Sequence, residues 1–392
     1  MYLNGDKMEE SRNLAKNNTR NYSLDLLRCV AMMMVVVLHF LDKGGQLKDF
    51  TDPGVFTAKD VTAWILEAFC IVAVNMYMLL SGYLLSESRF KLSNLLLLVA
   101  RVWLYSVIVG FIGIALGTPQ ESVDTYFYLR LLFPVSMATY WFMTAYVFFY
   151  LLVPVLGIAA RVMDKKQLQI VIAGLLFFHC IIKSVMPATL SADVGGMDAM
   201  WYIVLFFVAV YIRKYVKKVE LPWVGYIATA LLVFGEAYVL RQVYLKTGSL
   251  SYIVKISYAY NHIFVLASSV FLFIAFLQFD LPEKQGKVFA FLGKYSLGVY
   301  LLHENLSVRY AWEKLFGCDK ITSVIGLLVS TIIAVVAVFV AGVIVDFAGR
   351  TVASRLIKVL GKAPGFSSVG AAVKKADSFF SHNKITTASN GK

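Results

Sequence analysis

Long apolar segments alternate with short polar ones over most of the chain, from about residue 22 to residue 345. Most are near the roughly twenty residues that an α-helix needs to cross the hydrocarbon core of a bilayer. The pattern predicts ten spanning helices, at residues 22–41, 61–85, 94–117, 141–160, 168–186, 199–216, 222–241, 259–279, 288–306 and 321–345. The expected fold is all-α, a polytopic membrane helix bundle at 22–345. A polar tail at 1–21 precedes it, and a basic, partly disordered tail at 346–392 follows it.

Composition supports a membrane protein with no separate soluble domain. The 392 residues are 59% hydrophobic and only 16% charged, with a mean hydropathy of +0.71. Soluble domains are about half apolar. The net charge of +13 does not indicate a nucleic-acid partner, because the basic residues lie in short clusters between apolar segments. The four cysteines are scattered without metal-ligand spacing, so neither a metal site nor a disulfide framework is expected.

The distribution of basic residues predicts the orientation of the bundle. If both tails lie on one side of the membrane, that side holds about twice as many Lys and Arg as the opposite loops. Lys and Arg are enriched in cytoplasmic loops. Both tails are therefore expected in the cytoplasm, with the bilayer itself as the main partner of the bundle.

The first span, NYSLDLLRCVAMMMVVVLHFL, contains three ionisable residues, Asp25, Arg28 and His39. Arg28 and His39 are eleven residues apart, close to three helical turns, so they share one face about 16 Å apart. Asp25 precedes Arg28 by three residues and supports the same stripe. Charged groups at membrane depth are costly and usually face a bundle interior or a wet cavity. The pair therefore favours a functional site, with Arg28 near the cytoplasmic face and His39 deeper.

The second and third spans add polar residues at both levels. Glu67 is expected at the depth of His39, where a carboxylate either orients the imidazole or reaches water at the interface. Ser81 and Tyr83 are expected near the cytoplasmic level, and Gly82 between them favours close helix packing. Arg101 either extends its side chain to the interface or supplies a second cation for an anionic cytoplasmic ligand.

The fourth and ninth spans carry aromatic and ionisable residues toward their outer ends. Tyr140 and Trp141 open the fourth span, as an interfacial aromatic belt does, and as a sugar-binding vestibule would. In the ninth span Tyr300 and His303 lie on one helical face, and Glu304 follows. The histidine and the carboxylate share the expected depth of the first-span histidine, which favours a role in substrate binding.

Four stretches together resemble acyltransferase family 3, the ten-helix bacterial enzymes that O-acylate sugars and cell-envelope polymers. The first stretch, LDLLRCVAMMMVVVLHF, reproduces the Arg, ten intervening residues and His of the family's first helix at Arg28 and His39. The other three are NMYMLLSGYLL (Asn75 to Leu85), YWFMTAYVFFYLLVP (Tyr140 to Pro154) and GKYSLGVYLLHE (Gly293 to Glu304). The chain is most similar to the shorter branch, which acetylates enterobacterial common antigen and similar polysaccharides.

The resemblance implies a bacterial plasma-membrane enzyme that uses acetyl-CoA as a co-substrate, with no permanently bound cofactor. It implies that an acyl group moves from cytoplasmic acyl-CoA to a hydroxyl of a sugar or polysaccharide at the outer side. Arg28 would then contact the CoA phosphates. His39 would act as general base on the acceptor hydroxyl or carry the acetyl group transiently.

A transporter is the main alternative from another class of protein. In a ten-helix exporter, the Asp25, Arg28 and His39 stripe would serve as a proton or anion relay. It would produce solute flux and release no CoA. A third interpretation is a structural or sensory membrane protein that kept the fold and lost the catalytic activity. The presence of both Arg28 and His39 argues against it.

Overall fold

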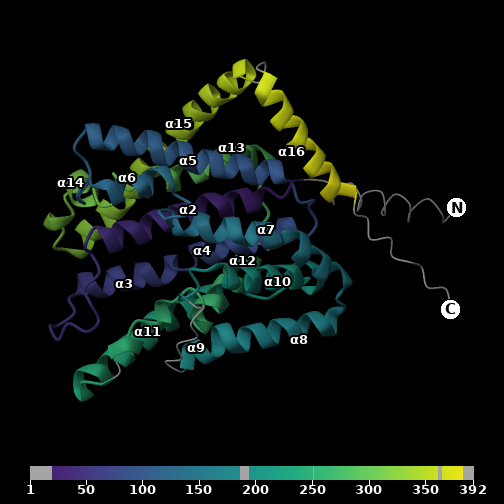
Figure 1. Ribbon diagram of the computed structural model, residues 1–392. Coiled ribbons are helices and arrows are strands. Elements are labelled where there is room, and N and C mark those ends of the chain that lie inside the picture. The colour runs from purple at the N-terminus through teal and green to yellow at the C-terminus, as the bar shows by residue number, and fades with distance from the viewer. Residues whose placement is uncertain (1–19, 186–193, 250, 361–363, 383–392) are drawn as a thin grey trace, which may run out of the picture.

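The computed structural model describes residues 20–185, 194–249, 251–360 and 364–382, and every regular element in these ranges is a helix. The helices lie side by side, and α2 runs through the middle of the assembly (Figure 1). The all-α prediction is confirmed. The longer helices are α2 (Tyr22–Lys43), α3 (Ala58–Cys70), α4 (Ala73–Leu85), α5 (Leu92–Ala115), α6 (Thr125–Leu132), α7 (Trp141–Val162), α8 (Lys165–Leu176), α10 (Ala199–Tyr215), α11 (Pro222–Thr247), α12 (Ile263–Gln278), α13 (Glu283–His303), α15 (Val324–Leu360) and α16 (Pro364–His382). Shorter elements are η1 (Phe177–Ile181), α9 (Ile182–Val185), η2 (Ser251–Ile253), η3 (Ile256–Tyr258), α14 (Trp312–Phe316) and η4 (Cys318–Lys320).

Eight helical segments within the described ranges are long and apolar enough to cross a membrane. The second of them contains α3 and α4 in series. The two remaining predicted spans, at 199–216 and 288–306, correspond to α10 and α13. Helix α10 has only 17 residues, and α13 carries charged residues over its first half. Length and composition therefore support eight spans directly, and the count of ten is not confirmed.

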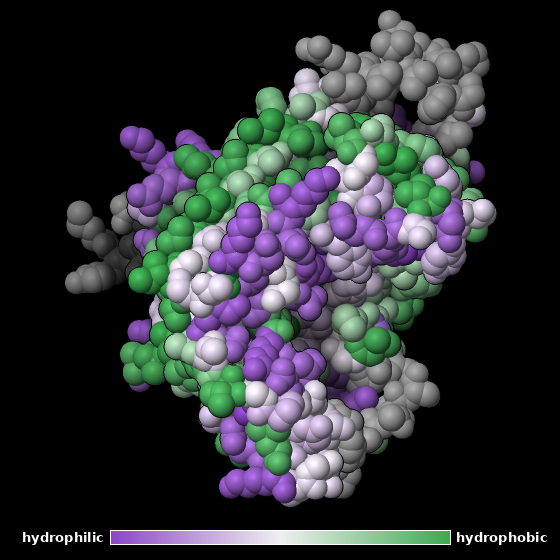
Figure 2. Space-filling view, turned by 90° about the vertical axis from the view of Figure 1, so that its left-hand side faces the viewer, coloured by the Kyte–Doolittle hydropathy of each residue, from purple (hydrophilic) through white to green (hydrophobic). Residues whose placement is uncertain are grey.

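The surface of the molecule has the polarity expected of a multi-pass membrane protein. Large apolar side chains are exposed along α5, α7, α11 and α15, among them Leu97, Val155, Val239 and Ile325. Figure 2 views the end of the bundle on the side of α3 and α14. Hydrophilic residues cross the middle of this face, and hydrophobic residues gather along its edges. Such an apolar perimeter is what lipid chains would contact.

Helices α2 and α13 pack against each other and run in the same direction. Asn21 caps α2 by accepting a hydrogen bond from the backbone N of Ser23. A Cβ at Gly293 would lie 3.2 Å from the backbone oxygen of Asp25, so the absence of a side chain permits the close approach there. The parallel arrangement places the first half of one helix beside the first half of the other.

Glycine also permits close packing elsewhere in the bundle. A Cβ at Gly82 of α4 would lie 2.9 Å from the Cα of Phe206 in α10, which agrees with the packing role expected from the sequence. A Cβ at Gly342 of α15 would overlap the Cα of Val299 in α13. Together with the contact at Gly293, this contact places α13 closely between α2 and α15.

Much of the C-terminal part of the chain, which was expected as a basic, partly disordered tail, is helical. Helix α15 continues past residue 345 to Leu360, and residues 364–382 form α16. Helix α16 packs on the start of α5, where the backbone N of Ser93 donates to Asp377 Oδ1 over 3.2 Å. Residues 1–19 and 383–392, to which the tail predictions also extended, lie outside the described residues.

Candidate active site

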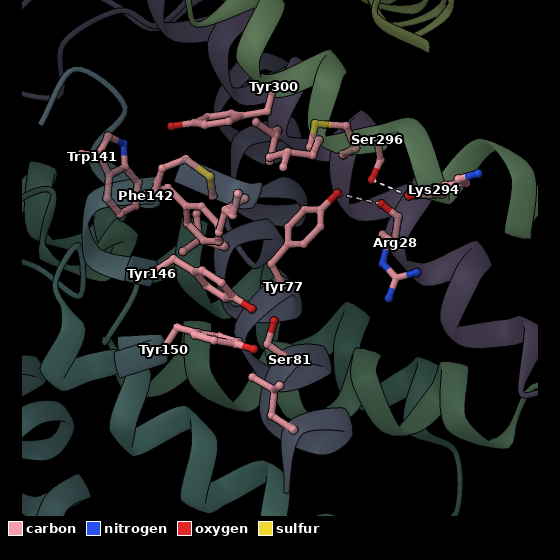
Figure 3. Close-up of a pocket in the computed structure, with 18 of the residues that line it drawn as sticks. Arg28, Tyr77, Ser81, Trp141, Phe142, Tyr146, Tyr150, Lys294, Ser296 and Tyr300 are labelled. Atoms are coloured by element: carbon pink, nitrogen blue, oxygen red, sulfur yellow. Dashed lines mark hydrogen bonds between the residues drawn. The ribbon is translucent and has the colours of Figure 1, made fainter. Parts of the chain in front are cut away.

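A cavity of about 480 Å³ lies among α2, α4, α5, α7 and α13. Figure 3 shows residues from four of these helices that line it: Arg28 from α2; Tyr77 and Ser81 from α4; Trp141, Phe142, Tyr146 and Tyr150 from α7; and Lys294, Ser296 and Tyr300 from α13. Arg28 and His39 both line it. The two polar residues that share one face of the first span therefore face a single space.

Two cations stand at one end of the cavity. The Arg28 Nη1 atom lies 3.0 Å from Asp25 Oδ1, and the Asp25 carboxylate also accepts two hydrogen bonds from Arg20. The backbone oxygen of Arg28 accepts a hydrogen bond from Tyr77 over 2.9 Å. The second cation is the exposed Lys294, which sequence reasoning did not single out. The Asp25 carboxylate therefore orients Arg28, as predicted from their positions on one face of the first span. Arg20 binds the same carboxylate.

His39 lies at the other end of the cavity and contacts a second histidine. Its Nδ1 atom is 2.8 Å from His303 Nε2. The His303 Nδ1 atom is 2.6 Å from the backbone oxygen of Val299. The His303 side chain is buried, and 18% of the His39 side chain is exposed. The parallel packing of α2 and α13 brings these two side chains together from positions 264 residues apart.

A carboxylate and two further cations complete this end of the site. Glu304 Oε1 lies 3.3 Å from His39 Nδ1 and also contacts Lys43 Nζ. An Arg309 Nη2 atom lies 3.9 Å from Glu304 Oε2, and the same guanidinium donates to the backbone oxygen of Glu304 over 2.9 Å. Sequence reasoning placed His303 and Glu304 at the correct depth. It missed Lys43, although this lysine follows His39 by one helical turn, and it missed Arg309.

The acid beside His39 is Glu304, and not Glu67. Glu67 is buried on α3, and its Oε2 atom has no hydrogen-bond partner among the described residues. The depth of Glu67 was estimated from the sequence, but the rotation of α3 about its axis depends on packing. The expected orienting acid therefore has its counterpart in Glu304, the residue directly after α13.

The ligating atoms of His39, His303 and Glu304 lie within 4.8 Å of one another, a spacing that also suits a metal ion. Two features of the surroundings work against a metal there. Lys43 and Arg309 already neutralise the carboxylate. The short contact between the two rings uses the nitrogens that a metal would need.

Aromatic rings form one wall of the cavity. Trp141 stacks on Tyr260, with ring centroids 5.8 Å apart and an interplanar angle of 28°. Tyr300 is buried, and its hydroxyl has no hydrogen-bond partner among the residues that the structure describes. Tyr140 is placed differently from expectation. It is fully buried outside the cavity lining, where its hydroxyl donates to the Leu301 backbone oxygen and accepts from Asn305.

The residues predicted near the cytoplasmic level occupy three different places. Ser81 lines the cavity beside Leu85. Tyr83 is not part of that lining, and its ring lies 4.7 Å from the guanidinium of Arg213. Arg101 lines a neighbouring cavity of about 610 Å³, where it binds Asp346 through two nitrogens. The two cavities share Asn94 and Leu98 of α5.

The family model for an acyltransferase domain matches residues 21–346, which contain every helix of the cavity. The chain belongs to acyltransferase family 3, as the four sequence stretches indicated. Neither a curated protein nor a solved structure matches it. The protein is therefore a multi-pass membrane acyltransferase.

Proposed function

We propose that this acyltransferase moves an acyl group, with acetyl as the expected group, from cytoplasmic acyl-CoA to a hydroxyl of a cell-envelope sugar or polysaccharide. The observation that carries the proposal is the single cavity with Arg28 at one end and His39 at the other. A donor that is anionic at one end and reactive at the other fits this separation. The proposed location is a bacterial plasma membrane with both tails in the cytoplasm.

The cationic end suits the phosphates of acyl-CoA. Arginine binds phosphate through planar, paired hydrogen bonds, and lysine adds a mobile point charge. Arg28 and Lys294 are the cations that line this cavity. The eleven-residue separation from Arg28 to His39 leaves about 16 Å for the pantetheine arm and the thioester. Arg101 remains a further proposed contact for the donor, reached through the adjoining cavity.

The imidazole end suits acyl transfer. His39 Nε2 would accept the proton of the acceptor hydroxyl while the hydroxyl oxygen attacks the thioester carbonyl carbon. A C–O bond forms, the C–S bond breaks, and the proton on His39 passes to the departing sulfur to give free CoA. The same nitrogen would carry the acetyl group if transfer takes two steps.

The aromatic wall supports a sugar acceptor. Trp141 and the rings around it present flat apolar faces beside the cavity. Sugar rings have apolar faces bounded by hydroxyl groups, which suits a surface that is apolar with few polar atoms. Tyr300 lines the cavity at the same end as His39 and would adjoin the reacting hydroxyl. His303 and Glu304, which were expected from the sequence to bind substrate, are not among the residues that line this cavity and instead contact His39.

The direct test is CoA release from acetyl-CoA by the purified protein in detergent, with and without crude cell-envelope glycan. We expect release that increases when glycan is added, with acetyl esters appearing on the glycan. If no CoA is released with any of several glycans, and acetyl-CoA does not change the melting temperature, the proposal is contradicted. Solute flux in vesicles would then test a transporter.

Arg28→Ala is expected to raise the KM for acetyl-CoA by roughly 10- to 100-fold, because a charge-assisted contact contributes about 1.5–3 kcal/mol. Its kcat should change little, since the guanidinium lies about 16 Å from the reacting atoms. Steady-state CoA release measures both constants. Arg213→Ala is the matched control, because this arginine stacks on Tyr83 away from the cavity lining. Equal effects of the two variants would remove Arg28 from the donor site.

Tyr300→Phe is expected to lower kcat by roughly 10- to 100-fold while the fold is kept. The Tyr300 hydroxyl, which has no hydrogen-bond partner within the described ranges, lies beside the reacting end of the cavity, where negative charge develops on the thioester oxygen. Tyr146→Phe, on the same cavity but nearer Ser81, serves as the control. If kcat is the same for both variants, Tyr300 does not stabilise the transition state.

A further inference from the structure

We propose that His303 is a positioning residue that fixes the tautomer of His39, so that the Nε2 atom of His39 is the unprotonated nitrogen. This inference rests on the proposed function, because it assigns a role in the proposed proton transfer. Its starting point is a hydrogen-bonded chain of three groups, in which the first group fixes the direction of donation: the Val299 backbone oxygen, the His303 ring and the His39 ring.

The direction of the chain follows from its first member. A backbone carbonyl oxygen can only accept, so the proton between Val299 and His303 sits on His303 Nδ1. A neutral imidazole carries one proton, which leaves His303 Nε2 as an acceptor. His39 Nδ1 lies 2.8 Å from that atom and must therefore donate to it. The lone pair of a neutral His39 is then on Nε2.

Packing holds both rings in this arrangement. The His303 ring meets Tyr300 at 86° and Trp312 at 69°, with ring centroids about 6 Å apart in each case. The His303 side chain is 3% exposed, so bulk water does not compete for its Nε2 atom. Val299 and His303 belong to the same helix, one turn apart. The helix therefore holds the Val299 carbonyl group in a fixed position relative to the His303 ring.

Glu304 acts at the next stage of the same process. When His39 gains a proton on Nε2, the ring becomes a cation whose Nδ1–H lies 3.3 Å from Glu304 Oε1. Lys43 and Arg309 hold the carboxylate in place from its other sides. The buried histidine thus selects the tautomer, and the buried carboxylate stabilises the imidazolium.

The test compares His303→Gln with His303→Leu in the full-length protein. The glutamine side-chain oxygen reaches the position of Nε2 and can accept from His39 Nδ1, whereas leucine fills the space without an acceptor. We expect His303→Leu to lower kcat by roughly 10²–10³-fold, since a misassigned tautomer disables a general base. The KM for acetyl-CoA should stay within about threefold, and His303→Gln should recover at least about tenfold in kcat.

His179→Leu provides the matched control, because this half-buried histidine lies in η1 and is not part of the cavity lining. The melting temperature and its shift with acetyl-CoA establish that each variant folds and binds the donor. Equal kcat values for wild type and His303→Leu would overturn the inference. A wild type that releases no CoA would instead contradict the proposed function.

Nitrogen-15 NMR of histidine-labelled protein gives a second, independent readout. The His39 signals, identified by their loss in His39→Ala, should show protonated Nδ1 and bare Nε2 in the wild type and in His303→Gln. In His303→Leu this preference should weaken, because only the Glu304 carboxylate, 3.3 Å from Nδ1, then favours a proton on that atom. Protonated Nε2 in the wild type would overturn the inference. So would a metal bound at one ion per chain that His303→Leu removes, because a metal would occupy these nitrogens instead.

Discussion

His39→Ala is expected to lower kcat for CoA release by at least roughly 10²–10⁴-fold, the range that a positioned general base contributes. His39 is the residue of the first span that reaches both the cavity and the buried cluster of His303 and Glu304. No other described histidine lines this cavity. A shortened side chain leaves the acceptor hydroxyl without a base and the thioester carbon without a competent nucleophile.

The experiment separates loss of chemistry from loss of structure. His39→Ala should keep the melting-temperature shift with acetyl-CoA, because Arg28 and Lys294 remain at the other end of the cavity. His179→Ala serves as the control for removing a histidine. Trapping with labelled acetyl-CoA then distinguishes a base from an acyl carrier, since only a carrier leaves label on the protein. Full activity in His39→Ala would remove this residue from the mechanism.

Asp346→Ala is expected to destabilise the fold by about 3–5 kcal/mol, because removing one member of a buried ion pair leaves the other charge uncompensated. Asp346 is 1% exposed and accepts hydrogen bonds from Arg101, Tyr105 and Arg350. The Arg101 side chain is only 19% exposed. This carboxylate therefore joins α5 to α15, which pack beside the cavity.

Thermal unfolding in detergent measures this effect, with Asp280→Ala at an exposed position as the control. The double variant Arg101→Leu with Asp346→Leu should recover much of the loss, since it removes both charges together. A melting temperature equal to wild type in Asp346→Ala would show that the ion pair is dispensable. A raised KM for acetyl-CoA in Arg101→Leu, with the melting temperature kept, would assign Arg101 to the donor site.

The sequence identified the helical class of the fold and two polar residues of the first span, Arg28 and His39, that line one cavity. Helical periodicity is local, so the eleven-residue spacing of Arg28 and His39 was enough to place both on one face. Their cost at membrane depth indicated a shared cavity, and both residues line one. The sequence also indicated how deep in the membrane each residue of a span lies. On that basis it placed His303 and Glu304 at the level of His39, and both contact His39.

Contacts between helices were accessible only from the tertiary structure. The rotation of each helix about its axis depends on packing, so Glu67 and Glu304 were equivalent by depth, but only Glu304 contacts His39. The same reason separates Trp141, which lines the cavity, from the buried Tyr140 beside it in the chain. Lys294 reaches the cationic end, whereas Arg101 is engaged by Asp346 in the adjoining cavity.

The resemblance of four stretches to a known family indicated an acyltransferase. The sequence by itself also determined a multi-pass helical bundle with Arg28 and His39 on one face of its first span. These properties depend on composition, local periodicity and residue spacing, which each segment carries alone. The tertiary structure decided which partners those residues have, because a contact such as His39 with His303 depends on how two helices 264 residues apart are packed. The protonation pattern of the site is a consequence of that packing.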